Sequence, residues 1–478
     1  MTTTITSSRT GNGLSLLANK CAARTFDISS GMVYASMRDQ IVRAQLLIRD
    51  LRKCDPSARR ILIVGAGVAG ISAAACAESL GIQAIVVESN SVPIHLQNNV
   101  RKRMVGPFMY EWPSILSNSQ SYPPTQNKLG EVIDFTPTWN STMPISAHDL
   151  ANDIVSWCTS LSTPLPYRMF HYGCVAAETK QYVRDFVAAH SLLRAAGANV
   201  KSPLITLPDK TNFQPDYVIL AVGMGTERTH LIEGTENDPA SVRGVPFWQD
   251  DDLRNTPNMD WQVGVFGGGD GALQDVLRLI TNFDHPLQFI DALNSGKDNI
   301  TKQLNKIMGQ LEALEQQSRL YATWSSGSIY DLIDLECERI CKTISSDNKV
   351  VQKVLAQIRD GEGTTTLVHR GTHFGKAYLL NRFCLHLIEK CLPPIRITGK
   401  VGYLRIQNAQ ADRARTELSG VHVVELDNGK IIRLDKVVVR FGPKQSELQE
   451  RQLVKLHPET QADRTSMASI PLPFTVAE

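Results

Sequence analysis

Residues 60–90 constrain the fold of this chain more than any other stretch. They begin with an apolar run at 61–64, continue through the glycine pattern G-x-G-x-x-G and a helical run of small residues, and end after a second apolar run at Glu88. Short, continuous apolar runs of this kind are typical of buried parallel strands. The stretch therefore predicts a strand–helix–strand unit that is buried on both faces.

Each part of this unit has a physical role in binding a dinucleotide. Gly65 makes the tight turn, Gly67 lets a pyrophosphate approach the backbone, and Gly70 lets the helix pack close to the strand. The free N–H groups at the start of the helix attract phosphates, and Glu88 can accept hydrogen bonds from ribose hydroxyls. The predicted cofactor-binding residues are Gly65, Ala66, Gly67, Val68, Ala69, Gly70 and Glu88. The alternative is a glycine-rich turn that binds nothing.

A second strand, glycine turn and helix follow at residues 262–281. The turn reads G-x-G-x-x-A, a variant that the dinucleotide pattern permits. Its predicted cofactor-binding residues are Gly267, Gly269, Asp270, Gly271 and Ala272. Two such units indicate either two nucleotide sites or a duplicated scaffold.

Two further runs, 216–223 and 435–442, each read as a buried strand that ends in glycine. Glycine has no side chain to collide with a ligand, so such a strand lets the backbone pass close beside a cofactor. Gly223 is therefore a further cofactor-binding candidate. Before the second of these strands, Asn428-Gly429 separates two alternating runs and predicts a hairpin.

Residues 101–113 combine basic and aromatic side chains with prolines. Because proline does not continue a helix, this segment is expected to be an irregular excursion and not a helix. In one interpretation Arg101 and Arg103 meet phosphates, while Tyr110 and Trp112 line a flat aromatic ring on the substrate side. In the other, the segment is a surface loop whose two aromatic residues are anchored in the core. The sequence favours neither.

The remaining segments are assigned by periodicity. Residues 1–30 are expected to be unstructured, and 31–51 to form a helix that packs on the outside of the domain or on a partner. Residues 282–363 are expected to form a helical insertion. Within it, Asp331, Asp334, Glu336 and Glu338 are expected on a solvated helix face, and the nearby Cys337 and Cys341 lack the spacing of a zinc site.

Composition excludes some classes of function. The chain has 478 residues, 21% of them charged, and a net charge of +2, which gives no electrostatic case for nucleic acid or an anionic membrane. No apolar run approaches the roughly 18 residues of a membrane span. Nine scattered cysteines favour reduced thiols and a cytoplasmic location.

The order of these elements resembles the flavoproteins that have two dinucleotide-binding domains, the group of thioredoxin-reductase-like and flavin-monooxygenase-like enzymes, over about residues 60–443. The resemblance implies an α/β fold with two Rossmann-like domains. The expected division is an N-terminal tail and helix (1–58), an FAD-binding domain (59–245 and 444–478), and a nested NAD(P)-binding domain (246–443) that carries the insertion.

In that group the first glycine turn binds FAD and the second binds NAD(P)H. A basic residue after the second strand of the NADPH domain grips the 2′-phosphate, and Arg370, with His369, matches this position. An alternative second strand at 286–291 would end in Asp291, which would favour NAD. The sequence departs from the group in having neither a paired cysteine near the glycine turns nor a late Gly-Asp segment that closes the FAD site.

The sequence therefore predicts an FAD-dependent NAD(P)H oxidoreductase of monooxygenase or oxidase/reductase type that passes electrons to oxygen or a small organic substrate. No catalytic residue is assigned; His148, His171, His369 and His373 are acid–base candidates. The alternatives are a nucleotide-binding sensor or interaction protein on the same fold, and a protein with one bound nucleotide only. A homodimer would form through the N-terminal helix or the insertion.

Overall fold

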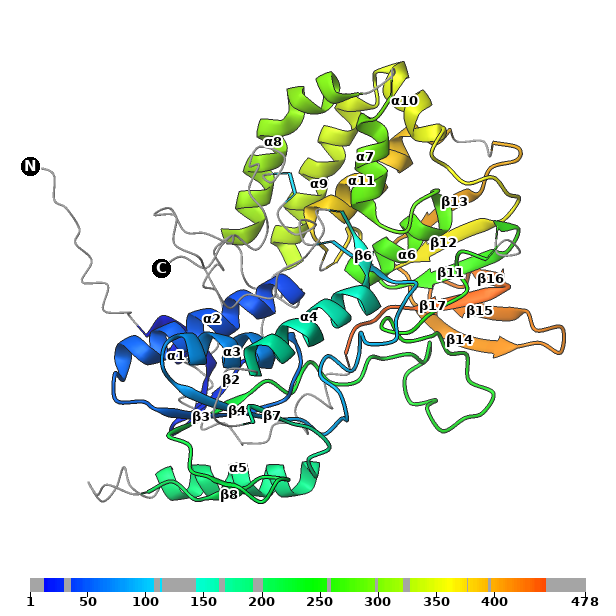
Figure 1. Cartoon of the computed structure of the whole chain (residues 1–478). Helices are drawn as coiled ribbons and strands as arrows, with labels where there is room; N and C mark the ends of the chain where they lie inside the picture. The colour runs from blue at the N-terminus through cyan, green and yellow to red at the C-terminus, as the bar shows by residue number, and fades with distance from the viewer. Residues whose placement is uncertain are drawn as a thin grey trace, which may run out of the picture.

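The computed structural model describes residues 13–29, 36–106, 112–113, 143–162, 168–191, 201–255, 259–296, 300–320, 327–375, 377–393 and 397–443. Within them the fold is mixed α/β, built around two sheets that lie side by side (Figure 1). Tyr110 and the segment 444–478 lie outside the described residues. None of the described helices is both long and apolar enough to cross a lipid bilayer.

The first sheet has six strands, five of them parallel. Their order is β1 (Lys20–Ala22), β2 (Thr25–Asp27), β10 (Tyr217–Leu220), β3 (Arg60–Val64), β4 (Gln83–Val87) and β7 (Phe170–His171), with only β1 antiparallel. Along β3, Ile61 and Ile63 face one layer while Leu62 and Val64 face the other. Burial on both faces explains the unbroken apolar run in the sequence.

Helices cover both faces of this sheet. One face carries α3 (Val68–Ser79), α2 (Met37–Cys54) and α4 (Ala147–Ser162), and the other carries α5 (Ala176–Ser191) with the short ribbon β8 (Ile205–Thr206) and β9 (Asn212–Phe213) (Figure 1). The predicted N-terminal helix is confirmed as α2. Its apolar stripe, which includes Ile41, Ala44 and Leu47, is buried in the same core cluster as the small residues of α3.

The expectation that residues 1–30 are unstructured is wrong for residues 14–28. The chain forms helix α1 (Leu14–Asn19) and then the strands β1 and β2, and the N–H of Ile28 donates to the carbonyl of Leu220 at 2.9 Å. Each strand is only three residues long, and β2 is stabilised by pairing with β10, a segment far along the chain. Local periodicity carries no signal for such a pairing.

The second sheet is wholly parallel, in the order β13 (Gly402–Ile406), β12 (Thr364–Val368), β11 (Gln262–Phe266) and β17 (Lys436–Val439). A three-stranded antiparallel sheet covers one of its faces, formed by β14 (Ala411–Thr416), β15 (His422–Leu426) and β16 (Ile431–Leu434). The predicted Asn-Gly hairpin is confirmed between β15 and β16, where Gly429 has a φ of 80°.

The helices of this half all lie on the opposite side of the sheet, in more than one layer (Figure 1). They are α6 (Asp270–Ile280), α7 (Pro286–Asn294), α8 (Thr301–Leu320), α9 (Gly327–Ile344), α10 (Asn348–Leu355) and α11 (Leu379–Cys391). The predicted insertion is therefore helical. Because residues 286–294 form α7, they cannot be the second strand of the nucleotide unit, and β12, parallel to β11, takes that place. Asp291 is an exposed helical residue.

The two halves of the molecule are joined where the strand-then-glycine segments end. The N–H of Arg228 donates to the carbonyl of Gly442 at 2.9 Å, and Glu227 pairs with Pro443 in an antiparallel bridge. A second connection is the excursion after β4, which forms β5 (Met104–Val105) against β6 (Ile145–Ser146) and whose Arg101 and Lys102 N–H groups both donate to Asp250 Oδ1 at 2.7 Å. The two sequence segments that echo each other thus meet in space.

Candidate dinucleotide sites

The first glycine turn, between β3 and α3, is built by two close backbone contacts. Gly65 has a φ of 106°, and a Cβ atom there would lie 2.4 Å from the carbonyl oxygen of Ala221. A Cβ atom at Gly70 would lie 1.9 Å from the carbonyl oxygen of Gly65. At Gly67, by contrast, a Cβ atom would meet no described atom within 4 Å. Packing therefore requires the first and third glycines, while the second faces open space.

The start of α3 has the features of a phosphate site. Gly67 is the N-cap in an extended conformation and offers no side chain to the helix. The first amides of any helix lack intrahelical acceptors, and the helix dipole is positive at this end. Val68 and Ala69 carry such amides next to the open space at Gly67. This donor set fits the diphosphate of a dinucleotide.

Glu88 follows β4 and is oriented by the glycine turn itself. Its Oε2 accepts from the N–H of Ala66 at 2.7 Å, and its Oε1 accepts from the backbone and side-chain N–H groups of Asn90 at 2.8 and 2.7 Å. A carboxylate has about four acceptor sites, and the exposed Ser89 Oγ also donates to Oε1 at 3.2 Å, so a ribose hydroxyl would take the place of the Ser89 hydroxyl. Gly223, beyond β10, has a φ of 80° and is exposed at the same edge of the sheet.

The second glycine turn repeats the first in part. A Cβ atom at Gly267, whose φ is 139°, would lie 2.3 Å from the carbonyl oxygen of Arg440. Gly269 is the N-cap of α6, and Ala272 is buried against the sheet. Asp270 stands in the first turn, where its Oδ1 accepts from the N–H of Tyr378 at 2.8 Å and from Asn381 at 2.7 Å. Its charge is thus directed toward the start of α11.

The loop after β12 carries the residues predicted to select NADP. Arg370 is exposed, and its guanidinium has no partner among the described side chains. His369 differs from the prediction because it is 3% exposed and its Nε2 accepts from Arg405 at 3.0 Å. Burial, with Arg405 nearby, lowers the pKa of His369 to about 4. His369 is therefore neutral and enclosed, and only Arg370 is open to a phosphate.

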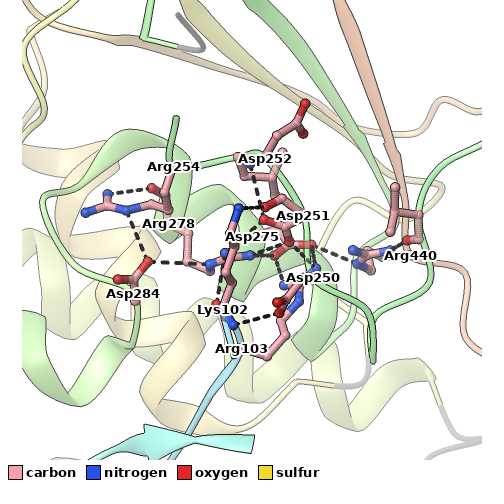
Figure 2. Close-up of polar contacts among 12 residues, drawn as sticks. Lys102, Arg103, Asp250, Asp251, Asp252, Arg254, Asp275, Arg278, Asp284 and Arg440 are labelled. Atoms are coloured by element: carbon pink, nitrogen blue, oxygen red, sulfur yellow. Dashed lines mark hydrogen bonds and ion pairs between the residues drawn. The ribbon is translucent and has the colours of Figure 1, made fainter. Parts of the chain in front are cut away.

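Arg103 was expected to meet a cofactor phosphate, but the structure places it in an ion cluster between the two halves (Figure 2). It is 2% exposed, pairs with Asp275 on α6, and lies 2.9 Å from Asp251. Asp275 also accepts from Arg278 at 3.1 Å and from Arg440 at 2.8 Å. Arg103 is therefore a structural residue and leaves the cofactor set.

Three arginines stabilise the ionised form of the Asp275 carboxylate. Burial alone would raise the pKa of this carboxyl, but Arg103, Arg440 and Arg278 lower it well below its usual range. Sequence reasoning missed the cluster because its members come from distant segments. One signal was available: Asp275 lies three residues after the buried Ala272, on the apolar face of its helix.

Trp112 lies in the core, as the second interpretation of the excursion expects for this residue. Its ring is 1% exposed and packs 4.9 Å from Phe383 on α11, inside the core of the second half. It does not line an open cofactor surface. Tyr110 remains a prediction, since it lies outside the described residues.

The acid–base candidates have structural partners. His148 Nδ1 bonds to the carbonyl of Asn98 at 2.7 Å, and His171 Nε2 bonds to the carbonyl of Arg168 at 2.9 Å. Burial lowers the pKa of His171. His373 Nδ1 lies 3.5 Å from a carboxylate oxygen of Asp334. No described histidine is therefore assigned a catalytic role.

The acidic face predicted for residues 331–338 is only partly solvated. Asp331 is exposed, but Asp334 is 1% exposed and enclosed between α9 and α11. The neighbouring thiols of Cys337, Cys341 and Cys384 are free and buried, and burial raises the pKa of Cys341 and Cys384. Among the described residues, no group of three or more metal-ligating side chains gathers.

Comparison with known proteins found remote structural likenesses only. No protein-family model and no curated protein matches the sequence. Among solved structures, a bacillithiol disulfide reductase from Bacillus cereus is 11% identical over 84% of this chain and 79% of that chain, with a TM-score of 0.33. An NAD-dependent persulfide reductase from A. fulgidus is 13% identical over 84% of this chain and 48% of that one, with a TM-score of 0.34.

A 2-naphthoyl-CoA reductase is 11% identical over 89% of this chain and 43% of that one, with a TM-score of 0.33. This chain thus spans less than half the length of the last two proteins. Likenesses at this level carry no argument about its reaction. The function is argued below from the residues of the two glycine turns.

Proposed function

We propose that this protein is an FAD-dependent NAD(P)H oxidoreductase. The observation that carries the proposal is the first glycine turn, where Gly65 and Gly70 are fixed by backbone contacts and Gly67 faces open space. Helix-end amides stand beside that space, and Glu88 is tied to the turn through Ala66. This combination fits a dinucleotide whose adenosine half lies toward β4.

In this proposal each turn has its own ligand. The amides of Val68 and Ala69 bind the diphosphate of FAD, and Glu88 binds its adenosine ribose. When bound, the flavin supplies the chemistry of accepting a hydride and passing electrons on. The start of α6, with Gly269 as its N-cap, receives the diphosphate of the nicotinamide nucleotide.

We further propose that the second nucleotide is NADP rather than NAD. A guanidinium after the second strand attracts a 2′-phosphate, whereas a carboxylate there repels it. Arg370 follows β12 and is exposed, while Asp291 lies on helix α7 and does not end a strand. The electron acceptor is proposed to be oxygen or a small organic molecule.

One observation favours a second candidate, a sensor or interaction protein that binds a nucleotide without turnover. The N–H of Gly375 donates to the carbonyl of Gly268 at 2.8 Å, so the loop after β12 packs directly on the second glycine turn. A loop in this place restricts access to α6. In that case only the first turn is occupied.

A visible spectrum of the purified protein separates the two candidates. The oxidoreductase is expected to show flavin absorbance that bleaches when NADPH is added without oxygen. A flavin-containing protein that NADPH and NADH both fail to bleach would support the sensor. A colourless protein that binds no FAD when it is added would contradict the proposed function.

A further inference from the structure

Asp334 connects the helical insertion to the loop that follows β12. It lies on α9, yet its carboxylate is directed away from solvent and is 1% exposed. Oδ2 accepts from the N–H of Phe374 at 3.0 Å, and Oδ1 accepts from Arg382 Nη1 at 2.7 Å and His386 Nε2 at 3.0 Å. One inserted carboxylate therefore contacts both the loop and α11.

Arg382, the arginine paired with Asp334, holds the same loop from its other side. It is fully buried on α11 and donates from Nη1 to the carbonyl of Phe374 at 3.1 Å and from Nε to the carbonyl of Ala377 at 3.0 Å. Its Nη2 donates to the carbonyl of Gly375. The N–H and the C=O of Phe374 are thus both bonded to members of one buried ion pair.

These contacts fix the path of the loop between two functional points. At one end, Arg370 is exposed immediately after β12. At the other, Gly375 is hydrogen-bonded to Gly268 in the second glycine turn. Between them, Arg405 and Gln407 donate to the carbonyl of Thr372 at 3.3 and 2.7 Å. Since the backbone is held at Thr372, Phe374 and Gly375, the direction in which Arg370 leaves the strand is restricted.

We propose that Asp334 is a positioning residue for the second nucleotide site, and that the helical insertion through it sets the preference for a nucleotide with a 2′-phosphate. This inference rests on the proposed function above. A preorganised loop loses less conformational entropy when Arg370 closes on a phosphate, so binding is tighter than with a mobile loop. NADH lacks the 2′-phosphate, and its binding depends less on the position of Arg370.

The test compares Asp334→Glu with Asp331→Glu. Asp334→Glu keeps the charge opposite Arg382 and His386 but moves the carboxylate by one methylene, which displaces the bond to Phe374. Asp331 lies on the same helix and is exposed, so Asp331→Glu is the matched control. The dissociation constants of NADPH and NADH are measured by titration of the flavin-loaded protein, together with flavin content and melting temperature.

We expect Asp334→Glu to raise the dissociation constant of NADPH about fivefold or more, as expected when a charge-assisted contact weakens. That of NADH should change less than about twofold, and Asp331→Glu should match the wild type. Equal weakening of both nucleotides, or none, in a protein with normal flavin content would overturn the positioning role. If Asp334→Glu fails to fold, Asp334→Asn, which keeps the size of the side chain and replaces one acceptor oxygen with an amide nitrogen, is measured in the same way.

Failure of the proposed function gives a different result. If the wild-type protein binds neither NADPH nor NADH, the proposed second nucleotide site is wrong, and so is the proposed role of Asp334. If the wild type prefers NADPH and the Asp334 variant keeps the same preference, only the proposed role of Asp334 is wrong.

Discussion

Arg103 and Asp275 form an ion pair that is enclosed between the two halves of the molecule, with side chains 3% and 0% exposed. Arg103 comes from the excursion after the first nucleotide unit, and Asp275 from the helix of the second. Replacing one partner of a buried ion pair leaves the charge of the other partner buried and unpaired. This lowers the free energy of unfolding far more than the loss of a surface ion pair does. The pair therefore fixes the two halves against each other.

The first prediction concerns stability. Arg103→Met is expected to lower the free energy of unfolding by about 3 kcal/mol, measured by urea denaturation. Arg413→Met is the control, because the pair between Arg413 and Asp412 is exposed and contributes under about 1 kcal/mol. Equal effects of the two variants would contradict the structural role of Arg103.

The second prediction concerns the glycines of the first turn. Gly70→Ala would bring a Cβ atom to 1.9 Å from a carbonyl oxygen, so it should destabilise the fold itself. Gly67→Ala meets no described atom, so the melting temperature of the flavin-free protein should stay unchanged while FAD affinity falls about tenfold or more. Gly309→Ala, on α8, is the control for both. Normal FAD affinity in Gly67→Ala would place the diphosphate elsewhere.

The third prediction concerns Arg370. Arg370→Glu replaces an exposed cation with an anion, so NADPH should bind about tenfold or more weakly while NADH binding changes little. Fluorescence titration with both nucleotides measures this, with Arg413→Glu as the matched surface reversal. An unchanged ratio of the two affinities would remove Arg370 from the site.

The fourth prediction concerns pH and His386. Burial alone would lower the pKa of His386, but its hydrogen bonds with Asp334 and Glu389 raise it to about 9. In the unfolded state the pKa of a histidine is about 6.5. Protonated His386 therefore stabilises the folded state fully at pH values below about 6.5, and this stability is lost as the pH rises through about 9.

The free energy of unfolding should therefore fall by on the order of 2–3 kcal/mol between about pH 6.5 and pH 9.5. His386→Gln should remove most of this slope in urea denaturation series. The control is His95→Gln, at an exposed position. If the pH dependence of the free energy of unfolding remains in His386→Gln, it is caused by other groups.

The parts of the fold that the sequence predicts are those with a local cause. Gly70 is required by its contact with Gly65 inside one strand–turn–helix unit, Gly65 takes the positive φ of that turn, and the helices of the insertion follow from their own apolar stripes. The choice between α7 and β12 as the second element of the nicotinamide unit was open, because both positions carry short apolar runs. The structure decides it through pairing of β12 with β11.

The parts that it misses depend on partners far along the chain. Arg103 is a basic residue in a loop, and only a carboxylate on a helix much later in the sequence makes it structural. Asp334 shares a helix face with the buried Cys337 and Cys341, which was a usable sign of burial. Its partners Arg382 and His386, however, lie on another helix, and no local pattern predicts the cluster.

The short strand β2 has a consequence for synthesis of the protein. Ser29, just beyond β2, is hydrogen-bonded to Leu220, which lies 191 residues later. At about 5–20 residues per second, the ribosome delivers the partner strand roughly 10–40 s after β2 has been made. Through that interval β2 has only β1 to pair with, and a chain trimmed to begin at Arg60 would leave β10 as a bare sheet edge that invites aggregation.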